Sequence, residues 1–120
     1  MNSFNVHTKI MTGGGLETVA PKLKRAFIVT DGFMSSSGKV SYITDKLEAA
    51  GVEYRVFDQV RADPDVGTVS KGVEAIQDFK PDAVIAFGGG SPIDAAKAIV
   101  FFAGKTCDMR ECQFIAVPTT

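Results

Sequence analysis

The chain has 120 residues, of which 45% are hydrophobic and 22% charged, as in an ordinary globular domain with a core of its own. Its 13 basic and 14 acidic residues give a net charge of −1, which offers no electrostatic footprint for nucleic acid. No apolar run is long enough to span a bilayer, and residues 1–5 do not start a secretory signal, so we expect a cytoplasmic protein with no nucleic-acid or membrane partner.

Short apolar runs along the chain alternate with longer amphipathic patterns. Residues 4–11 predict an edge strand that ends in the glycines at 13–15, and a short helix then begins near Leu16 and is limited by Pro21. Residues 53–57 alternate between polar and apolar side chains and predict a more exposed strand. Three nearly continuous apolar runs have the pattern of strands buried on both faces of a parallel sheet: residues 26–30, 83–87 and 114–117.

Amphipathic patterns between these strands predict longer helices. The first covers residues 36–50 and is stopped by Gly51. The second covers residues 64–79, with Asp63 as its N-cap and Pro64 as its first residue. Its apolar face is formed by five side chains: Val66, Val69, Val73, Ile76 and Phe79.

A third helix is expected over residues 92–103, after Ser91 as its N-cap. Asp94 completes a Ser-x-x-Asp capping pattern there. Strands that alternate with helices fold as βαβ units with right-handed crossovers. The sequence therefore predicts an α/β fold, with residues 1–120 forming one dinucleotide-binding domain around a Rossmann-like, mostly parallel sheet with flanking helices.

The last buried strand before this helix runs directly into Gly88, Gly89, Gly90 and Ser91. A helix N-terminus presents unpaired N–H groups, and glycines let a phosphate approach the backbone closely, so the segment predicts an anion site. A tight turn needs the same glycines, and a plain turn is the alternative. The segment is not G-x-G-x-x-G, because Ile93 stands where the third spaced glycine would fall, and no Walker Gly-Lys-Ser/Thr follows.

The pattern Gly-Gly-Gly-Ser-x-x-Asp-x-x-Lys at residues 88–97 resembles the signature of the iron-containing, group III alcohol dehydrogenases. Three further segments resemble elements of that family in the same order: Thr30-Asp31, Asp63-Pro64 and Val117-Pro118-Thr119-Thr120. Within the family, residues 4–15 and the turn at 31–33 look most like the propanol dehydrogenases of diol-utilisation pathways. That likeness adds the interior of a bacterial microcompartment as an alternative location.

The resemblance implies a binding site for NAD. Four residues would hold the pyrophosphate: Gly88, Gly89, Gly90 and Ser91. Asp94 would lie near the nicotinamide, and Thr119 and Thr120 would line the cofactor cleft. Asp31 would accept hydrogen bonds from the adenosine ribose and repel a 2′-phosphate, which favours NAD over NADP.

Each of these implied roles has a purely structural alternative. Asp31 is also a suitable turn residue before Gly32. Asp94 would otherwise only cap its helix. Thr119 and Thr120 would otherwise only end a strand.

The family's iron is held by one aspartate and three histidines, all from a helical C-terminal domain. This sequence has one histidine, His7, expected on the surface, and two cysteines, Cys107 and Cys112, expected to be ordinary thiols. No metal ligand and no catalytic residue is therefore expected in this chain. We expect a piece that is truncated before the helical metal-binding domain and inactive alone.

In a full-length enzyme, the chain would serve the NAD- and iron-dependent interconversion of short primary alcohols and aldehydes, such as propanol and propanal. Two alternatives stay open: a non-catalytic phosphate- or nucleotide-binding module, and a flavodoxin-like interaction domain whose glycines only turn the chain. A homo-oligomer is expected, assembled through an exposed apolar patch or through the sheet edge at residues 4–11.

Overall fold

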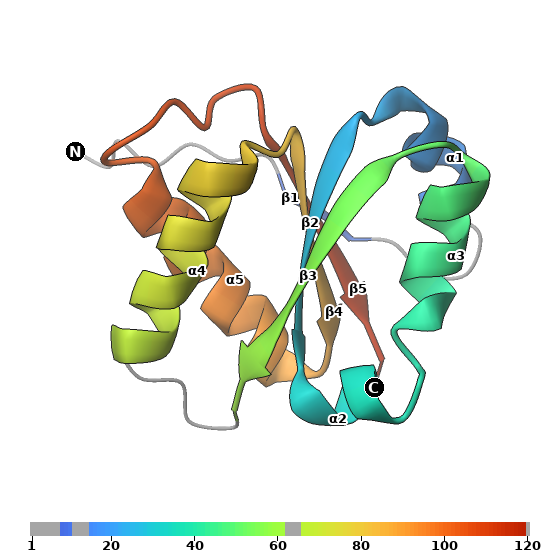
Figure 1. The fold of residues 1–120 in the computed structure, drawn as a ribbon, viewed down its shortest axis with the longest axis horizontal. Coiled ribbons are helices and arrows are strands. Elements are labelled where there is room, and N and C mark those ends of the chain that lie inside the picture. Colours follow the sequence, from blue (N-terminus) through green and yellow to red (C-terminus); the bar gives the residue numbers. More distant parts are fainter. Residues whose placement is uncertain (1–7, 11–14, 62–65, 120) are drawn as a thin grey trace.

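The computed structural model describes residues 8–10, 15–61 and 66–119 (Figure 1). Within these residues, parallel strands form one five-stranded sheet in the order β1-β5-β4-β2-β3. The strands are β1 (Thr8–Ile10), β2 (Arg25–Asp31), β3 (Glu53–Val60), β4 (Ala83–Gly88) and β5 (Gln113–Pro118). The helices are α1 (Gly15–Val19), the 3-10 turn η1 (Ala20–Lys22), α2 (Gly32–Ser36), α3 (Ser41–Ala49), α4 (Val66–Phe79) and α5 (Gly90–Ala103).

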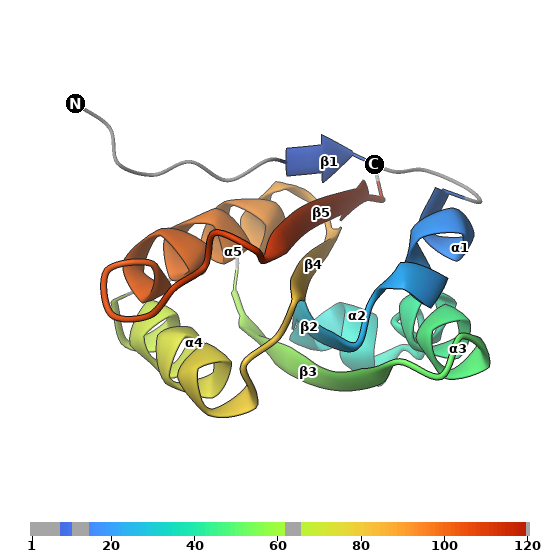
Figure 2. The same ribbon diagram turned by 90° about the horizontal axis from the view of Figure 1, so that it is seen from above.

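Helices cover both faces of the sheet, as Figure 2 shows: α4 and α5 lie on one side, and α1 and α3 on the other. The β4 strand is buried along its whole length, and β2 and β5 are buried except at their ends. This two-sided burial accounts for the continuous apolar runs and confirms the predicted Rossmann-like α/β fold. No helix within the described ranges is long and apolar enough to cross a membrane.

The edges of the sheet also follow the sequence pattern. The predicted edge strand over residues 4–11 is present as β1, which pairs with β5, although residues 4–7 and 11 lie outside the described part. At the other edge, β3 alternates between exposed and more buried positions over its first half, as predicted for residues 53–57.

The helix predicted over residues 36–50 is wrong in its first part, because the chain forms two helices there. The Asp31 carboxylate accepts a hydrogen bond from the N–H of Met34 at 2.8 Å and caps the short α2. Gly38 then adopts a φ of +84°, which L side chains rarely reach, and α3 begins only at Ser41. Gly51, at a φ of +74°, follows the end of α3 as predicted.

The α4 helix ends at Phe79 as predicted, but one residue of its predicted core face is wrong. Val66 is 82% exposed, because it stands at the first position of the helix and not over the sheet. The remaining predicted members pack into the core: Val69, Val73, Ile76 and Phe79. The proposed N-cap, Asp63, and Pro64 lie outside the described residues.

The two helices on this face are in close contact where Gly72 of α4 meets Ile99 of α5. A Cβ atom at position 72 would lie 2.4 Å from Cδ1 and 2.8 Å from Cγ1 of Ile99. Ile99 is completely buried and has little room to move aside. Glycine at this helix position is therefore required by packing.

We expect Gly72→Ala to lower the free energy of unfolding by about 1 kcal/mol, because overpacking costs more than the gain in helix propensity. Urea denaturation followed by circular dichroism measures the change. The matched control is Ser70→Ala, at an exposed position of the same helix. In an Ile99→Val background the added methyl group has more space, so the loss from Gly72→Ala should shrink. An equal loss in both backgrounds would disprove the proposed contact.

Candidate functional site

The carboxyl ends of parallel strands share one edge of the sheet, where open α/β proteins bind ligands. Two hydrogen bonds hold neighbouring strand ends together at this edge. The buried Thr30 hydroxyl, from β2, donates to the carbonyl oxygen of Phe87, in β4, at 2.8 Å. The N–H of Thr119, just after β5, donates to the carbonyl oxygen of Gly88 at 3.0 Å. The structure thus brings Asp31, the glycine loop and Thr119 to one edge.

The three glycines of the loop have different environments. Gly88 has a φ of +137°, and a Cβ there would lie 2.9 Å from Cγ of Pro92. Both the backbone and the packing therefore require glycine at position 88. A Cβ at Gly89 or Gly90 would meet nothing within 4 Å. These two positions leave open space directly in front of α5.

The α5 helix begins earlier than the sequence pattern predicted. Gly90 is its first residue and Gly89 its N-cap, so Ser91 and Asp94 do not form the expected capping pattern. The physical reason is the turn at Gly88, which lets the chain become helical at once and places Ser91 inside the first turn. Gly89, the N-cap residue, has no side chain that could cap the helix. Its first N–H groups and the positive end of its dipole therefore face the open space, an arrangement that can bind an anion.

Asp31 is the N-cap of the short helix α2. Its Oδ1 accepts the hydrogen bond from the N–H of Met34 and caps α2, so the residue predicted either as a ribose ligand or as a turn residue is a helix N-cap at the end of β2. The side chain is half-buried, and its Oδ2 makes no hydrogen bond to another described residue. The cap thus fixes the orientation of the carboxylate and leaves one oxygen available to a ligand.

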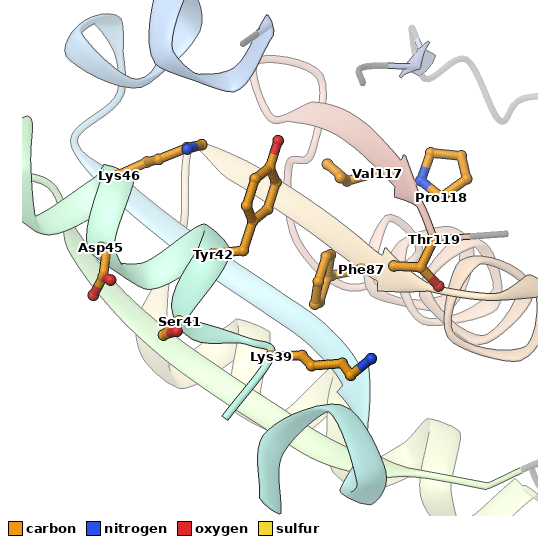
Figure 3. Close-up of a pocket in the computed structure, with 9 residues that line it drawn as sticks. All are labelled: Lys39, Ser41, Tyr42, Asp45, Lys46, Phe87, Val117, Pro118 and Thr119. Carbon is orange, nitrogen blue, oxygen red and sulfur yellow. The ribbon is translucent and has the colours of Figure 1, made fainter. Parts of the chain in front are cut away.

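A pocket of about 660 Å³ lies beside Thr119, on the face covered by α3 (Figure 3). Its floor is aromatic, because Tyr42 stacks on Phe87 with ring centroids 6.2 Å apart and an interplanar angle of 19°. Lys39 and Lys46 add positive charge to its lining. The sequence analysis missed this pocket. Tyr42 and Phe87 belong to different elements, and no local pattern links them.

A second pocket, of about 510 Å³, opens between the carboxyl end of β3 and the first turns of α4. Gly32, directly after Asp31, contributes to its lining. Arg61 and Lys71 place two cations there. The sequence analysis missed this pocket as well, because its residues come from α2, β3 and α4.

The remaining candidates for chemistry lie apart from the carboxyl edge or outside the described ranges. In residues 8–10, 15–61 and 66–119, no three His, Cys, Asp or Glu side chains gather where they could hold a metal ion. Cys107 and Cys112 are both free thiols. Burial, aided by the negative charge of Asp82, raises the pKa of the Cys112 thiol to about 12, so it is a poor nucleophile. His7 and Thr120 lie outside the described residues.

Comparison with known proteins assigns the chain to a family. Residues 8–120 match the sequence profile of the family described as iron-containing alcohol dehydrogenase. That match covers nearly the whole chain and includes every described element from β1 to β5. The chain therefore belongs to the iron-containing alcohol dehydrogenase family.

Individual relatives are longer than this chain. It is 37% identical over 123 residues to the 1-propanol dehydrogenase PduQ of Citrobacter freundii, covering 100% of this chain and 32% of that enzyme. It is 53% identical over 81 residues to the bifunctional aldehyde-alcohol dehydrogenase AdhE of Escherichia coli (strain K12), which covers 68% of this chain and 9% of that protein. The iron-containing alcohol dehydrogenase of Thermococcus thioreducens superposes with a TM-score of 0.76 at 26% identity, over 98% of this chain and 37% of that one.

The different roles of the loop glycines predict different effects of adding a methyl group. We expect Gly88→Ala to lower the free energy of unfolding by about 2 kcal/mol, because it combines a strained backbone with a clash against Pro92. We expect Gly90→Ala to change it by less than about 0.5 kcal/mol, because its methyl group enters open space. Urea denaturation of both variants measures the difference. Equal losses of unfolding free energy in the two variants would show that Gly88 and Gly90 do not have different structural roles.

Proposed function

We propose that this chain is the NAD-binding part of an iron-dependent alcohol dehydrogenase that interconverts short primary alcohols and aldehydes, such as propanol and propanal. The observation that carries the proposal is the uncapped N-terminus of α5, with open space before Gly89 and Gly90 at the carboxyl edge of the sheet. Membership of the family supports the reaction class. The propanol dehydrogenase among its relatives supports a short primary alcohol as substrate.

In this proposal the pyrophosphate of NAD lies against the start of α5. Four residues contact it through backbone N–H groups or a hydroxyl: Gly88, Gly89, Gly90 and Ser91. The fit is sterically sound, because a Cβ is absent from the two positions that face open space. Asp94, which is exposed on the second turn of α5, lies towards the nicotinamide. Thr119, just after β5, would line the cofactor cleft, and Thr120, predicted for the same role, lies outside the described residues.

Asp31 is the proposed partner of the adenosine ribose. It stands at the end of β2, the strand next to β4 and its glycine loop. Its Oδ2 would accept hydrogen bonds from the ribose hydroxyls while Oδ1 keeps the cap of α2. A carboxylate at this place repels a 2′-phosphate, so we propose NAD as the preferred cofactor.

Iron, when bound in the full-length enzyme, would act as the Lewis acid that polarises the alcohol or carbonyl oxygen. The described residues offer no ligand set that fits it, so we place the iron ligands outside them. The contribution of this chain is to bind and orient NAD. We therefore expect no NAD-linked oxidation of propanol by the 120-residue chain alone. The cytoplasmic location and the homo-oligomeric state stay predictions from the sequence.

Titration of the chain with NAD, followed by two-dimensional NMR and calorimetry, tests the proposal. We expect saturable binding that shifts the backbone amide signals of residues 88–91. Gly90→Ala should weaken NAD binding by about tenfold, because its methyl group obstructs the phosphate and costs a charge-assisted hydrogen bond. Lys105→Ala, in the loop at the other end of α5, is the control and should bind as the unmodified chain does. Absence of NAD binding, or binding that leaves residues 88–91 unshifted, would contradict the proposed site.

The variant Asp31→Asn distinguishes the role of Asp31 as the N-cap of α2 from the effect of its negative charge on cofactor choice. Asparagine is as good an N-cap as aspartate, so α2 and the stability should be preserved. Removal of the negative charge should shift the ratio of NAD to NADP affinity about tenfold towards NADP. Parallel calorimetric titrations with both cofactors measure the ratio. An unchanged ratio in a variant that unfolds at the same urea concentration as the original chain would rule out Asp31 as the selecting group.

A further inference from the structure

The proposed cofactor site lies across a topological switch point of the sheet. The β2 strand leads into α2 and α3, and the neighbouring β4 leads into α5. Figure 2 shows α3 and α5 on opposite faces of the sheet. Where the connections of two adjacent strands leave to opposite faces, a crevice opens between their carboxyl ends. Asp31 ends β2 on one side of this crevice, and Gly88 ends β4 on the other.

Main-chain pairing between the two strands stops before it reaches this crevice. The last pair in their register is Val29 of β2 with Ala86 of β4. On the other side of β2, the register with β3 shifts between Val29 and Asp31. Regular strand pairing therefore does not by itself fix the position of Asp31 relative to Gly88.

The side chain of Thr30 links the two strands at this point. Its hydroxyl donates to the carbonyl oxygen of Phe87 at 2.8 Å, and the residue is completely buried. The branched side chain of threonine has few rotamers, and a buried acceptor without a donor is costly, so this hydrogen bond holds a defined geometry. Thr30 directly precedes Asp31, and Phe87 directly precedes Gly88. The bond thus joins the neighbours of the proposed ribose contact and of the proposed pyrophosphate contact.

We propose that Thr30 is a positioning residue for the cofactor, whose hydroxyl sets the distance between the carboxylate of Asp31 and the N–H groups of the glycine loop. The inference rests on the proposed function of this edge as an NAD site. Thr30 is completely buried and has no surface to offer a ligand, so it acts through its neighbours. Its effect is therefore confined to ligands that contact both sides of the crevice at once. Such a ligand gains from its second contact only when the two contacts lie at the matching distance.

The variant Thr30→Val tests this role, because it removes the hydroxyl and keeps the shape of the side chain. We expect it to weaken NAD binding by about tenfold, since the spacing of the two contacts is no longer held. Adenosine reaches only Asp31, and pyrophosphate reaches only the glycine loop. Their affinities should each change by less than about twofold. NMR titrations of the whole 120-residue chain measure all three ligands, and a general structural defect would weaken all three alike.

Two further variants and a matched control complete the experiment. Thr30→Ser restores the hydroxyl and should return the NAD affinity to within about threefold of the original value. Thr30→Cys keeps a weak donor and should fall between the serine and valine variants; it takes the place of Thr30→Val if that chain does not fold. The control Thr44→Val makes the same change at a buried threonine of α3, beside Tyr54 at the amino end of β3. It should leave NAD binding unchanged.

The outcomes separate the positioning role from the proposed function. The positioning role is overturned, and the cofactor site stands, if Thr30→Val leaves NAD affinity unchanged, if it weakens all three ligands equally, or if Thr44→Val causes the same loss. Absence of adenosine or pyrophosphate binding to the unmodified chain would also contradict the role, because it requires a separate contact on each side of the crevice. If the unmodified chain does not bind NAD, the proposed function itself is overturned, and the role of Thr30 with it.

Discussion

The backbone conformation of Gly88 is the constraint on which the carboxyl edge depends. Its φ of +137° redirects the chain from β4 into α5, and the ring of Pro92 packs where a Cβ would otherwise stand. Its carbonyl oxygen accepts the N–H of Thr119 and so positions the end of β5. A single residue thereby determines where α5 begins, where its dipole points and which strand end lies beside it. Gly89 and Gly90 follow this turn, and because they lack a Cβ they leave the space in front of α5 open.

Much of the fold could be predicted because strands buried on both faces of a sheet have a recognisable sequence pattern. The runs at 26–30, 83–87 and 114–117 are apolar at successive positions, and short runs of this kind, bounded by turn residues, are typical of strands covered on both faces. The role of glycine at 51 could be predicted equally well, because a helix commonly ends in a left-handed residue. These patterns involve residues close together in the sequence, so they can be recognised without knowledge of the tertiary structure.

The errors arose where two local signals competed or where no local signal exists. Asp31 is a cap as well as the end of a strand, and its cap creates α2, which amphipathic periodicity cannot reveal in five residues. At the glycine loop, Ser91 is an acceptable N-cap, yet the turn at Gly88 starts the helix before it. The pockets contain residues such as Phe87 and Arg61, which meet their neighbours in the pocket only after distant elements pack. No spacing rule in one sequence could have found them.

The cap that Asp31 provides for α2 supports its proposed role as a partner of the ribose. A free carboxylate at a strand end would rotate, whereas the hydrogen bond from the N–H of Met34 to Oδ1 restricts the rotation of this one. The same cap anchors α2 and so places Gly32 at the margin of the neighbouring pocket. Along the carboxyl edge, the positive end of α5, the carboxylate of Asp31 and the cation of Arg61 then follow in that order. The net charge of −1 for the whole chain does not reveal this alternation of positive and negative groups. A ligand that spans the carboxyl edge would be selected by the order of the charged groups along it, and not by its net charge.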